Sequence, residues 1–198
     1  MKQLFILATT VILAVAVNGQ QSRYISVAGF TTQTAMPFAK FSGLFTGIFH
    51  PGAEIGYGKN FKVKAKHDWF AELKLAYFFH RFVQHGIPLY ANMGYRYKIS
   101  SRFMVQTAIG AGYMHSIPAT AKFKLNDNGE YKNNKGIGRM QAMATYSIGG
   151  GYVLNPSSKK TITVFASYQQ LIQMPFVKSY VPLLPYNSFV MGIKKQIR

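Results

Sequence analysis

Cysteine is absent from the 198 residues of the chain, so neither a disulfide nor a thiolate metal site can form. Acidic residues are scarce as well: five Asp and Glu stand against 23 Lys and Arg, which gives a formal charge of +18. Charged residues make up 14% and aromatic residues 15%, a composition that excludes a disordered basic chain. A folded protein this basic is expected to have an anionic neighbour, such as nucleic acid, a lipid headgroup or a lipopolysaccharide phosphate.

Long apolar runs are missing outside the N-terminus, so no helix is predicted to cross a membrane in the rest of the chain. The sequence opens with "MKQLFILATTVILAVAVNGQQ", where Lys2 precedes an apolar run and small or polar residues follow. This order is typical of a secretory signal, and the run is short for a transmembrane anchor. We predict a signal peptide over residues 1–20 and an exported domain over residues 21–198. Export excludes nucleic acid from the expected partners.

Alternation with a period of two residues, typical of strands, dominates the exported part. In residues 67–80, for example, Leu73 and Leu75 alternate with Glu72 and Lys74. The pattern occurs eight times, at residues 23–32, 47–60, 67–80, 89–100, 102–115, 139–154, 160–173 and 186–197. Strands of soluble proteins have about five or six residues, whereas a tilted strand needs about nine to eleven to cross a bilayer. The sequence therefore predicts an all-β fold, an eight-stranded antiparallel up-and-down transmembrane β-barrel.

The connections between these segments alternate in length. Short turns are expected at 61–66, at Ser100 and Ser101, and at 155–160, and longer loops at 33–46, 117–138 and 174–185. The loop expected at 81–86 is similar in length to the turn at 61–66 and departs from this alternation. Both chain ends and the short turns then lie on one side of the barrel, as in outer-membrane proteins.

The two faces of each segment are assigned by composition. The polar faces carry small residues that suit the cramped interior of an eight-stranded barrel, namely Gly94, Gly110, Gly112, Gly149, Gly151 and Gly192. Tyrosines gather near the segment ends, as in the aromatic girdles of membrane barrels: Tyr57, Tyr77, Tyr95, Tyr97, Tyr113 and Tyr152. We therefore expect the apolar faces to contact lipid and the polar faces to fill the lumen.

The signal sequence, the eight alternating segments and the glycine-rich faces resemble the small outer-membrane barrels of the OmpA-like group. Segments such as "RFVQHGIPLY" and "FVKSYVPLLPYN" make the chain most similar to uncharacterised outer-membrane barrel proteins. The resemblance covers the whole exported part. It implies the outer membrane of a Gram-negative bacterium, contact with its lipid and lipopolysaccharide, insertion by the barrel assembly machinery, and no cofactor. Many such barrels end in an aromatic residue, whereas this chain ends in Ile197 and Arg198.

Charged residues on the predicted lumen faces are expected to pair, because an unpaired charge in a dry lumen costs several kcal/mol. The predicted ion-pair network comprises Glu54, Glu72, Lys74, Arg96 and Lys98. The alternatives for this cluster are a gate that conducts protons or ions, and a catalytic carboxylate.

An acyl hydrolase that modifies lipid A is the enzymatic alternative. Some of the small outer-membrane barrels that the chain resembles are lipid A deacylases, and this type carries a His-x-Ser pair on one strand, so that base and nucleophile share a face. Here Ser116 directly follows His115, and adjacent strand residues point to opposite faces, so the pair is not expected to form without a bulge. His67 and Asp68 are predicted at a wet turn, and His80 and His85 in a solvent-facing loop without a third metal ligand.

Two long loops are candidate interaction sites. The loop over residues 117–138 is expected to project as a hairpin and to contact lipopolysaccharide phosphates through Lys122, Lys124, Lys132, Lys135 and Arg139. The loop over residues 174–185 is unusually apolar, so we expect it to cover the barrel mouth, rest on the membrane or bind a partner.

We conclude from the sequence that a structural or interaction role at the outer membrane, without catalysis, is favoured. The alternatives are the lipid A-modifying hydrolase, a small pore or apolar-ligand conduit, and a soluble lipocalin-like carrier. The oligomeric state is left open.

Overall fold

The computed structural model describes residues 22–35, 44, 47–121, 123–126, 128–133, 136–158, 160–176 and 182–197. The predicted signal peptide lies outside these residues. The strands are β1 (Ser22–Thr34), β2 (Pro51–Val63), β3 (His67–His80), β4 (Gln84–Lys98), β5 (Phe103–Pro118), β6 (Phe123–Leu125), β7 (Tyr131–Asn133), β8 (Arg139–Val153), β9 (Ile162–Met174) and β10 (Leu184–Gln196).

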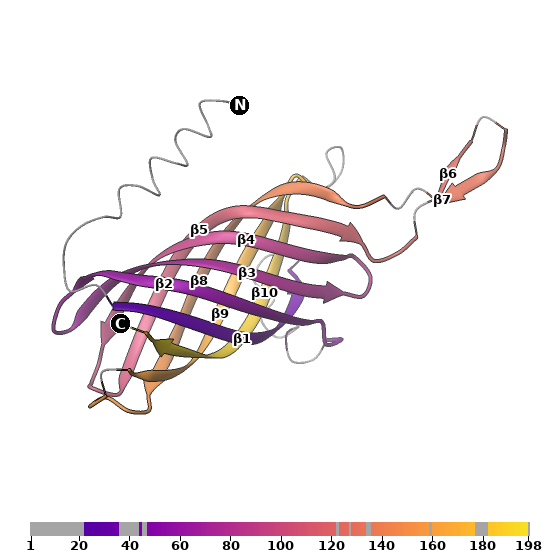
Figure 1. Cartoon of the computed structure of the whole chain (residues 1–198). Coiled ribbons are helices and arrows are strands. Elements are labelled where there is room, and N and C mark those ends of the chain that lie inside the picture. Colours follow the sequence, from indigo (N-terminus) through magenta and orange to yellow (C-terminus); the bar gives the residue numbers. More distant parts are fainter. Residues whose placement is uncertain are drawn as a thin grey trace, which may run out of the picture.

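Eight of these strands form a closed barrel in the order β1-β10-β9-β8-β5-β4-β3-β2, and every neighbouring pair is antiparallel. The two remaining strands, β6 and β7, form a hairpin that projects beyond one end of the barrel (Figure 1). The predicted eight-stranded antiparallel up-and-down barrel is confirmed. None of the helical residues that the structure describes belongs to a segment long and apolar enough to cross a membrane.

The two ends of the barrel differ in their connections. At one end, which we call the turn end, lie the first residues of β1, the last of β10 and the connections β2–β3, β4–β5 and β8–β9 (Figure 1). The Ile197 amide donates to the Arg23 carbonyl there at 2.8 Å, so the start of β1 and the end of β10 are adjacent. The opposite end, the loop end, carries the connections β1–β2, β3–β4, β5–β8 and β9–β10.

The predicted strand boundaries are shifted in several places, most at β4, which begins at Gln84 rather than at residue 89. The predicted loop over 81–86 is therefore a tight turn, closed by a bond of 3.0 Å from the Val83 amide to the His80 carbonyl. Gly86 and Pro88 lie within the strand. Pro88 has no partner in β3 because proline lacks the N–H that the ladder requires, but it still pairs with Met114 on the other side.

Burial alternates along each barrel strand as the two-residue period predicts. In β3 the side chains of Phe70, Glu72 and Lys74 are buried, whereas Leu73 and Leu75 are exposed. The exterior carries aliphatic and aromatic side chains around the whole barrel, including Ile25, Val27, Ile55, Tyr57, Leu73, Tyr77, Met93, Val105, Ile109, Ile148, Met191 and Ile193. An apolar exterior around a polar interior is typical of a transmembrane barrel and opposite to a soluble one.

Glycines let the strands approach one another where large lumen side chains need room. A Cβ atom on Gly110 would lie 2.0 Å from Asn92 Oδ1, and one on Gly112 would lie 2.3 Å from the Leu89 carbonyl oxygen. The predicted placement of glycine on the lumen faces therefore has a steric reason.

Candidate functional site

The lumen is the candidate functional site, and its centre holds a buried ion-pair cluster. Lys74 Nζ lies 2.6 Å from Glu54 Oε1 and 3.9 Å from Glu72 Oε2. The Tyr90 hydroxyl donates to the other Glu54 oxygen at 3.0 Å, and the Ser26 hydroxyl donates to Glu72 Oε1 at 2.7 Å. All five side chains are buried. Each carboxylate thus has a charged and a neutral partner, which is what burial of charge requires.

Arg96 and Lys98 belong to a second cluster nearer the turn end, rather than to one network with Glu54. Lys98 Nζ lies 2.8 Å from Asp68 Oδ1, and Arg96 Nη1 lies 3.8 Å from Asp68 Oδ2. Arg96 Nη1 also donates to Asn60 Oδ1 at 3.3 Å. The prediction of Asp68 at a wet turn is wrong, because its side chain is only 4% exposed. The register of β3 and β4 places Asp68 opposite Arg96 and so directs the carboxylate into the lumen.

Lys194 is a lumen cation that the predicted network omits. It lies in β10 and is buried, with Nζ above three aromatic rings at 4.6 Å from Tyr24, 5.3 Å from Phe165 and 5.5 Å from Phe70. Its polar contact is Gln106 Oε1 at 3.4 Å. The alternation of residues 186–197 already places Lys194 on the polar face, but only barrel closure shows which charges it meets.

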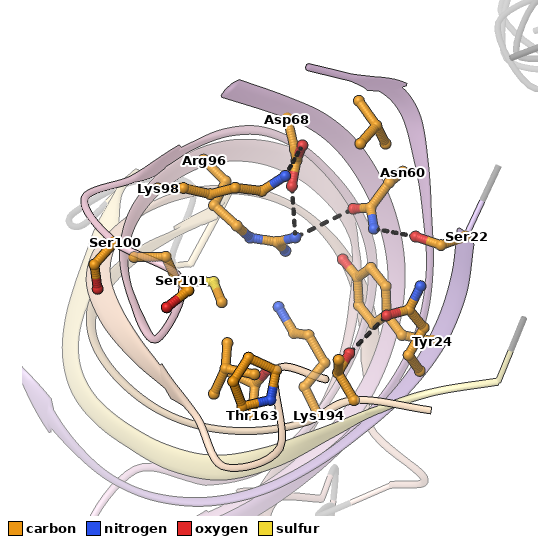
Figure 2. Close-up of a pocket in the computed structure, with 16 residues that line it drawn as sticks. Ser22, Tyr24, Asn60, Asp68, Arg96, Lys98, Ser100, Ser101, Thr163 and Lys194 are labelled. Atoms are coloured by element: carbon orange, nitrogen blue, oxygen red, sulfur yellow. Dashed lines mark hydrogen bonds and ion pairs between the residues drawn. The ribbon is translucent and has the colours of Figure 1, made fainter. Parts of the chain in front are cut away.

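A cavity of about 300 Å³ opens at the turn end, and we call it the vestibule. Figure 2 shows the Lys194 ammonium pointing into it from one wall and the Arg96 guanidinium and Lys98 on the opposite wall. The full lining is Ser22, Tyr24, Asn60, Val63, Asp68, Arg96, Lys98, Ser100, Ser101, Met104, Val153, Pro156, Thr161, Thr163, Lys194 and Gln196. The vestibule therefore has three cations and one carboxylate in its wall.

Amides and apolar side chains fill the loop end of the lumen. Gln84 Nε2 donates to Gln173 Oε1 at 2.6 Å and to the Tyr186 hydroxyl at 2.9 Å, and Gln173 donates to Gln141. A cluster of buried apolar side chains surrounds this layer: Phe78, Tyr90, Met114, Met143, Leu171, Leu184 and Tyr186. Phe176 packs against it from the β9–β10 loop, so the described part of that loop partly covers the mouth. Val177, Tyr180 and Val181 lie outside the described residues.

Two histidines stack at the same end. The rings of His50 and His80 lie 3.7 Å apart at an interplanar angle of 10°. The prediction of His80 in a solvent-facing loop is wrong, because His80 is the last residue of β3 and is buried. Burial lowers the pKa of His50, which lies before β2, so its neutral ring is favoured at neutral pH. No group of three potential metal ligands occurs among the residues that the structure describes.

His115 and Ser116 do not form a catalytic pair. The Ser116 hydroxyl is buried in the lumen and donates to Gln84. The His115 ring contacts the Ile137 carbonyl oxygen through Nε2 at 2.9 Å and the Tyr113 hydroxyl through Nδ1 at 3.0 Å. β5 pairs with β8 without a bulge at this point, so the two side chains stay on opposite faces of the strand.

Three of the predicted loop cations, Lys124, Lys132 and Arg139, lie in the described residues. Lys124 pairs with Lys132 in the hairpin register, and the Lys132 side chain is exposed. Arg139 begins β8, where its guanidinium lies 5.5 Å from the centre of the Phe176 ring. Lys122 and Lys135 lie outside the described residues.

No protein-family model matches the chain, and no curated protein matches it. Several solved structures have a similar fold. One is Ail, the attachment invasion locus protein of Yersinia pestis, whose structure was solved in complex with the heparin analogue sucrose octasulfate. It is 14% identical over 91% of this chain and 100% of that chain, with a TM-score of 0.46. Neisserial surface protein A is 6% identical over 89% of this chain and 96% of that chain, with a TM-score of 0.49.

The N-terminal β-barrel domain of Pseudomonas aeruginosa OprF is 14% identical over 90% of this chain and 100% of that chain, with a TM-score of 0.43. These proteins are small outer-membrane barrels, the group that the sequence resembles. Identities this low carry no information about activity, ligands or partners.

Proposed function

We propose that the chain is an integral protein of the outer membrane of a Gram-negative bacterium, with a structural or interaction role and no catalysis. The observation that carries the proposal is the alternation of exposed aliphatic side chains with buried charges in the same strand, as at Leu73, Lys74 and Leu75 in β3. Water penalises such an exterior, whereas acyl chains stabilise it, by about 25 cal/mol for each Å² of apolar surface removed from water. The exported chain would reach the membrane after signal-peptide cleavage and insert through the barrel assembly machinery.

Electrophoretic mobility tests this proposal. Protein extracted from outer membranes with detergent is expected to migrate differently before and after boiling, because a closed barrel resists the detergent until it is heated. The chain in the membrane is expected to lack residues 1–20, which the mass of the intact protein measures. Recovery of the folded chain from the periplasm without detergent would contradict the proposal and favour a soluble carrier.

The filled lumen argues against the pore and the conduit. Tyr90 links Glu54 on one side of the central layer to Gln169 on β9, with bonds of 3.0 and 3.1 Å. The loop end is closed by the glutamine layer and the apolar cluster around it.

The separate faces of His115 and Ser116 argue against the hydrolase. Unchanged lipid A acylation in cells with and without the gene is the expected result by mass spectrometry.

Contact with lipopolysaccharide phosphates is the interaction that we propose for the β6–β7 hairpin. The register pairs Lys124 with Lys132, whose side chain is exposed, and ammonium groups bind phosphate oxygens with charge-assisted hydrogen bonds. The neighbouring cations that we include are Lys122, Lys135 and Arg139. The hairpin stands clear of the barrel, where headgroups could reach it (Figure 1).

A charge substitution with a matched control tests the hairpin contact. Lys132→Gln is expected to weaken binding of the folded protein to vesicles that contain lipopolysaccharide, by about threefold to tenfold, because each cation near an anionic surface contributes about 1 kcal/mol. Lys160→Gln removes the same charge at the turn end and is expected to have no effect when the loop end faces the lipopolysaccharide. Equal weakening of binding by both variants would indicate general charge attraction and would contradict the proposal that the hairpin contacts lipopolysaccharide phosphates.

A further inference from the structure

The vestibule at the turn end has more positive charge than its own carboxylate can neutralise. Its wall carries Arg96, Lys98 and Lys194 against Asp68 alone. Asp68 is engaged by Lys98 at 2.8 Å and by Arg96 at 3.8 Å. Among the described residues, no carboxylate oxygen lies within 4.0 Å of Lys194 Nζ. Lys194, which lines the opening, therefore has no carboxylate within ion-pair distance.

An unused hydrogen-bond donor faces the same space. Arg96 is 5% exposed, and its Nη2 atom has no hydrogen-bond partner among the described residues. The Tyr24 hydroxyl also lines the vestibule and interacts with the Arg96 side chain. A buried donor without a partner is costly, and such groups commonly mark a place that a water, ion or ligand occupies. Here the Arg96 donor lines a cavity together with the Lys194 ammonium, which has no carboxylate within ion-pair distance.

The chemistry of the wall selects an oxyanion. We propose that the vestibule binds a phosphate-type oxyanion, with Lys194 and Arg96 as its charged donors. Guanidinium and ammonium groups bind phosphate oxygens with strong, charge-assisted hydrogen bonds. Hydroxyl groups of Ser100, Ser101 and Thr163 line the same cavity and can donate to further oxygens.

The size of the cavity limits the ligand to a small molecule or a headgroup. A volume of about 300 Å³ lies at the lower end of the range for small-molecule sites. Exposed cations lie at the turn end, at the end of β2 and on the turns: Lys62, Lys64, Lys66, Arg102 and Lys160. A ring of like charge raises the local concentration of anions and speeds their association. Either a soluble phosphate compound or a lipid phosphate offers the chemistry that this wall recognises.

Titration calorimetry on the full exported chain, folded in zwitterionic detergent micelles, tests the proposal. Inorganic pyrophosphate is the soluble probe, and dihexanoyl phosphatidylglycerol below its micelle concentration is the lipid probe. Lys194→Met keeps the length and apolar stem of the side chain but removes the ammonium. It is expected to weaken binding about tenfold or more, since one charge-assisted contact is lost.

Lys195→Met is the matched control, because Lys195 is the next residue of β10 and its side chain is exposed on the outer face. It is expected to change the affinity less than twofold. Binding of pyrophosphate that depends on Lys194 supports a soluble ligand, and binding of the lipid probe alone with the same dependence supports a headgroup. Absence of binding for both probes, or equal affinities of the two variants, would overturn the proposal.

A second variant keeps the test decisive if Lys194→Met does not fold. Ser101 is exposed in the β4–β5 turn and lines the vestibule, so Ser101→Glu adds a negative charge at the entrance without changing the packed lumen. It is expected to weaken pyrophosphate binding at least threefold at low salt. Ser157→Glu adds the same charge in the β8–β9 turn outside the lining and is expected to leave binding nearly unchanged. Equal effects of the two substitutions would show that the vestibule is not the site.

Discussion

Lys74 on β3 and Glu54 on β2 form an ion pair of 2.6 Å inside the barrel, where both side chains are almost completely buried. The Tyr90 hydroxyl and the Ser26 hydroxyl complete the partners of Glu54 and Glu72 around it. The hydrogen bonds and ion pairs of this cluster therefore connect side chains of β1, β2, β3 and β4 inside the lumen. Loss of Lys74 leaves the Glu54 and Glu72 carboxylates without this cation in a dry space, whereas neutralising both Lys74 and Glu54 leaves only Glu72 without it.

Lys74→Met is expected to lower the free energy of unfolding by about 3–5 kcal/mol, because the Glu54 carboxylate loses its cation. The double variant Glu54→Gln/Lys74→Met is expected to recover part of that loss. Urea unfolding of the barrel in lipid vesicles measures both. Lys195→Met is the control, since the same side chain is removed from the outer face. If Lys74→Met were as stable as Lys195→Met, the lumen pair would have no structural role.

Gly110→Ala is expected to impair folding, because the added Cβ would lie 2.0 Å from Asn92 Oδ1 and 2.6 Å from the Ala91 carbonyl oxygen. Overpacking of this kind costs about 1–3 kcal/mol when neighbours can shift, and backbone on one side limits the shift here. Gly150→Ala on β8 is the matched control, since its Cβ would meet only the Met104 carbonyl oxygen, at 3.5 Å. The fraction of chain that folds into vesicles measures the difference. Equal folding yields would contradict the close packing of the lumen.

Planar-bilayer recordings are expected to show no stable conductance steps for the folded protein. The reason is that the central layer of Glu54, Lys74, Tyr90 and Gln169 is bonded across the lumen, and the glutamine layer and apolar cluster close the loop end. Regular single-channel steps that persist in repeated preparations would contradict the filled lumen and would favour the alternative that the protein is a small pore. An open vestibule at the turn end does not by itself conduct, because it stops at these layers.

The barrel could be predicted from the sequence because a two-residue period reports directly which side chains share a face. Leu73 and Lys74 fall on opposite faces whatever the neighbouring strands are. The boundary of β4 could not be predicted, since Gly86 and Pro88 are typical loop residues and their place in the strand depends on pairing with β5. The local sequence therefore determines which side chains share a face of a strand, whereas pairing with the neighbouring strands determines where the strand begins and ends.

The site could be predicted only in part, because it depends on contacts between strands distant in sequence. Glu54, Glu72 and Lys74 lie on neighbouring strands, so their proximity follows from strand order alone. Lys194 reaches Tyr24 and Phe70 only when β10 closes the barrel against β1. The pairing of β10 with β1 joins the two ends of the sheet and cannot be predicted from a local sequence pattern. The stack of His50 on His80 likewise requires β2 and β3 to be paired with their loop ends level.

Accessibility of nitroxide spin labels at Leu75, Ile109 and Ile148 tests the membrane assignment most directly. These outward side chains are 45%, 65% and 51% exposed on three different strands. In reconstituted vesicles we expect oxygen dissolved in the lipid to relax all three labels, and a water-soluble nickel chelate to leave them unaffected. A label at Tyr131 on the hairpin is the aqueous control, because that side chain is 74% exposed beyond the barrel end. Relaxation of the three barrel labels by the nickel chelate would contradict the assignment.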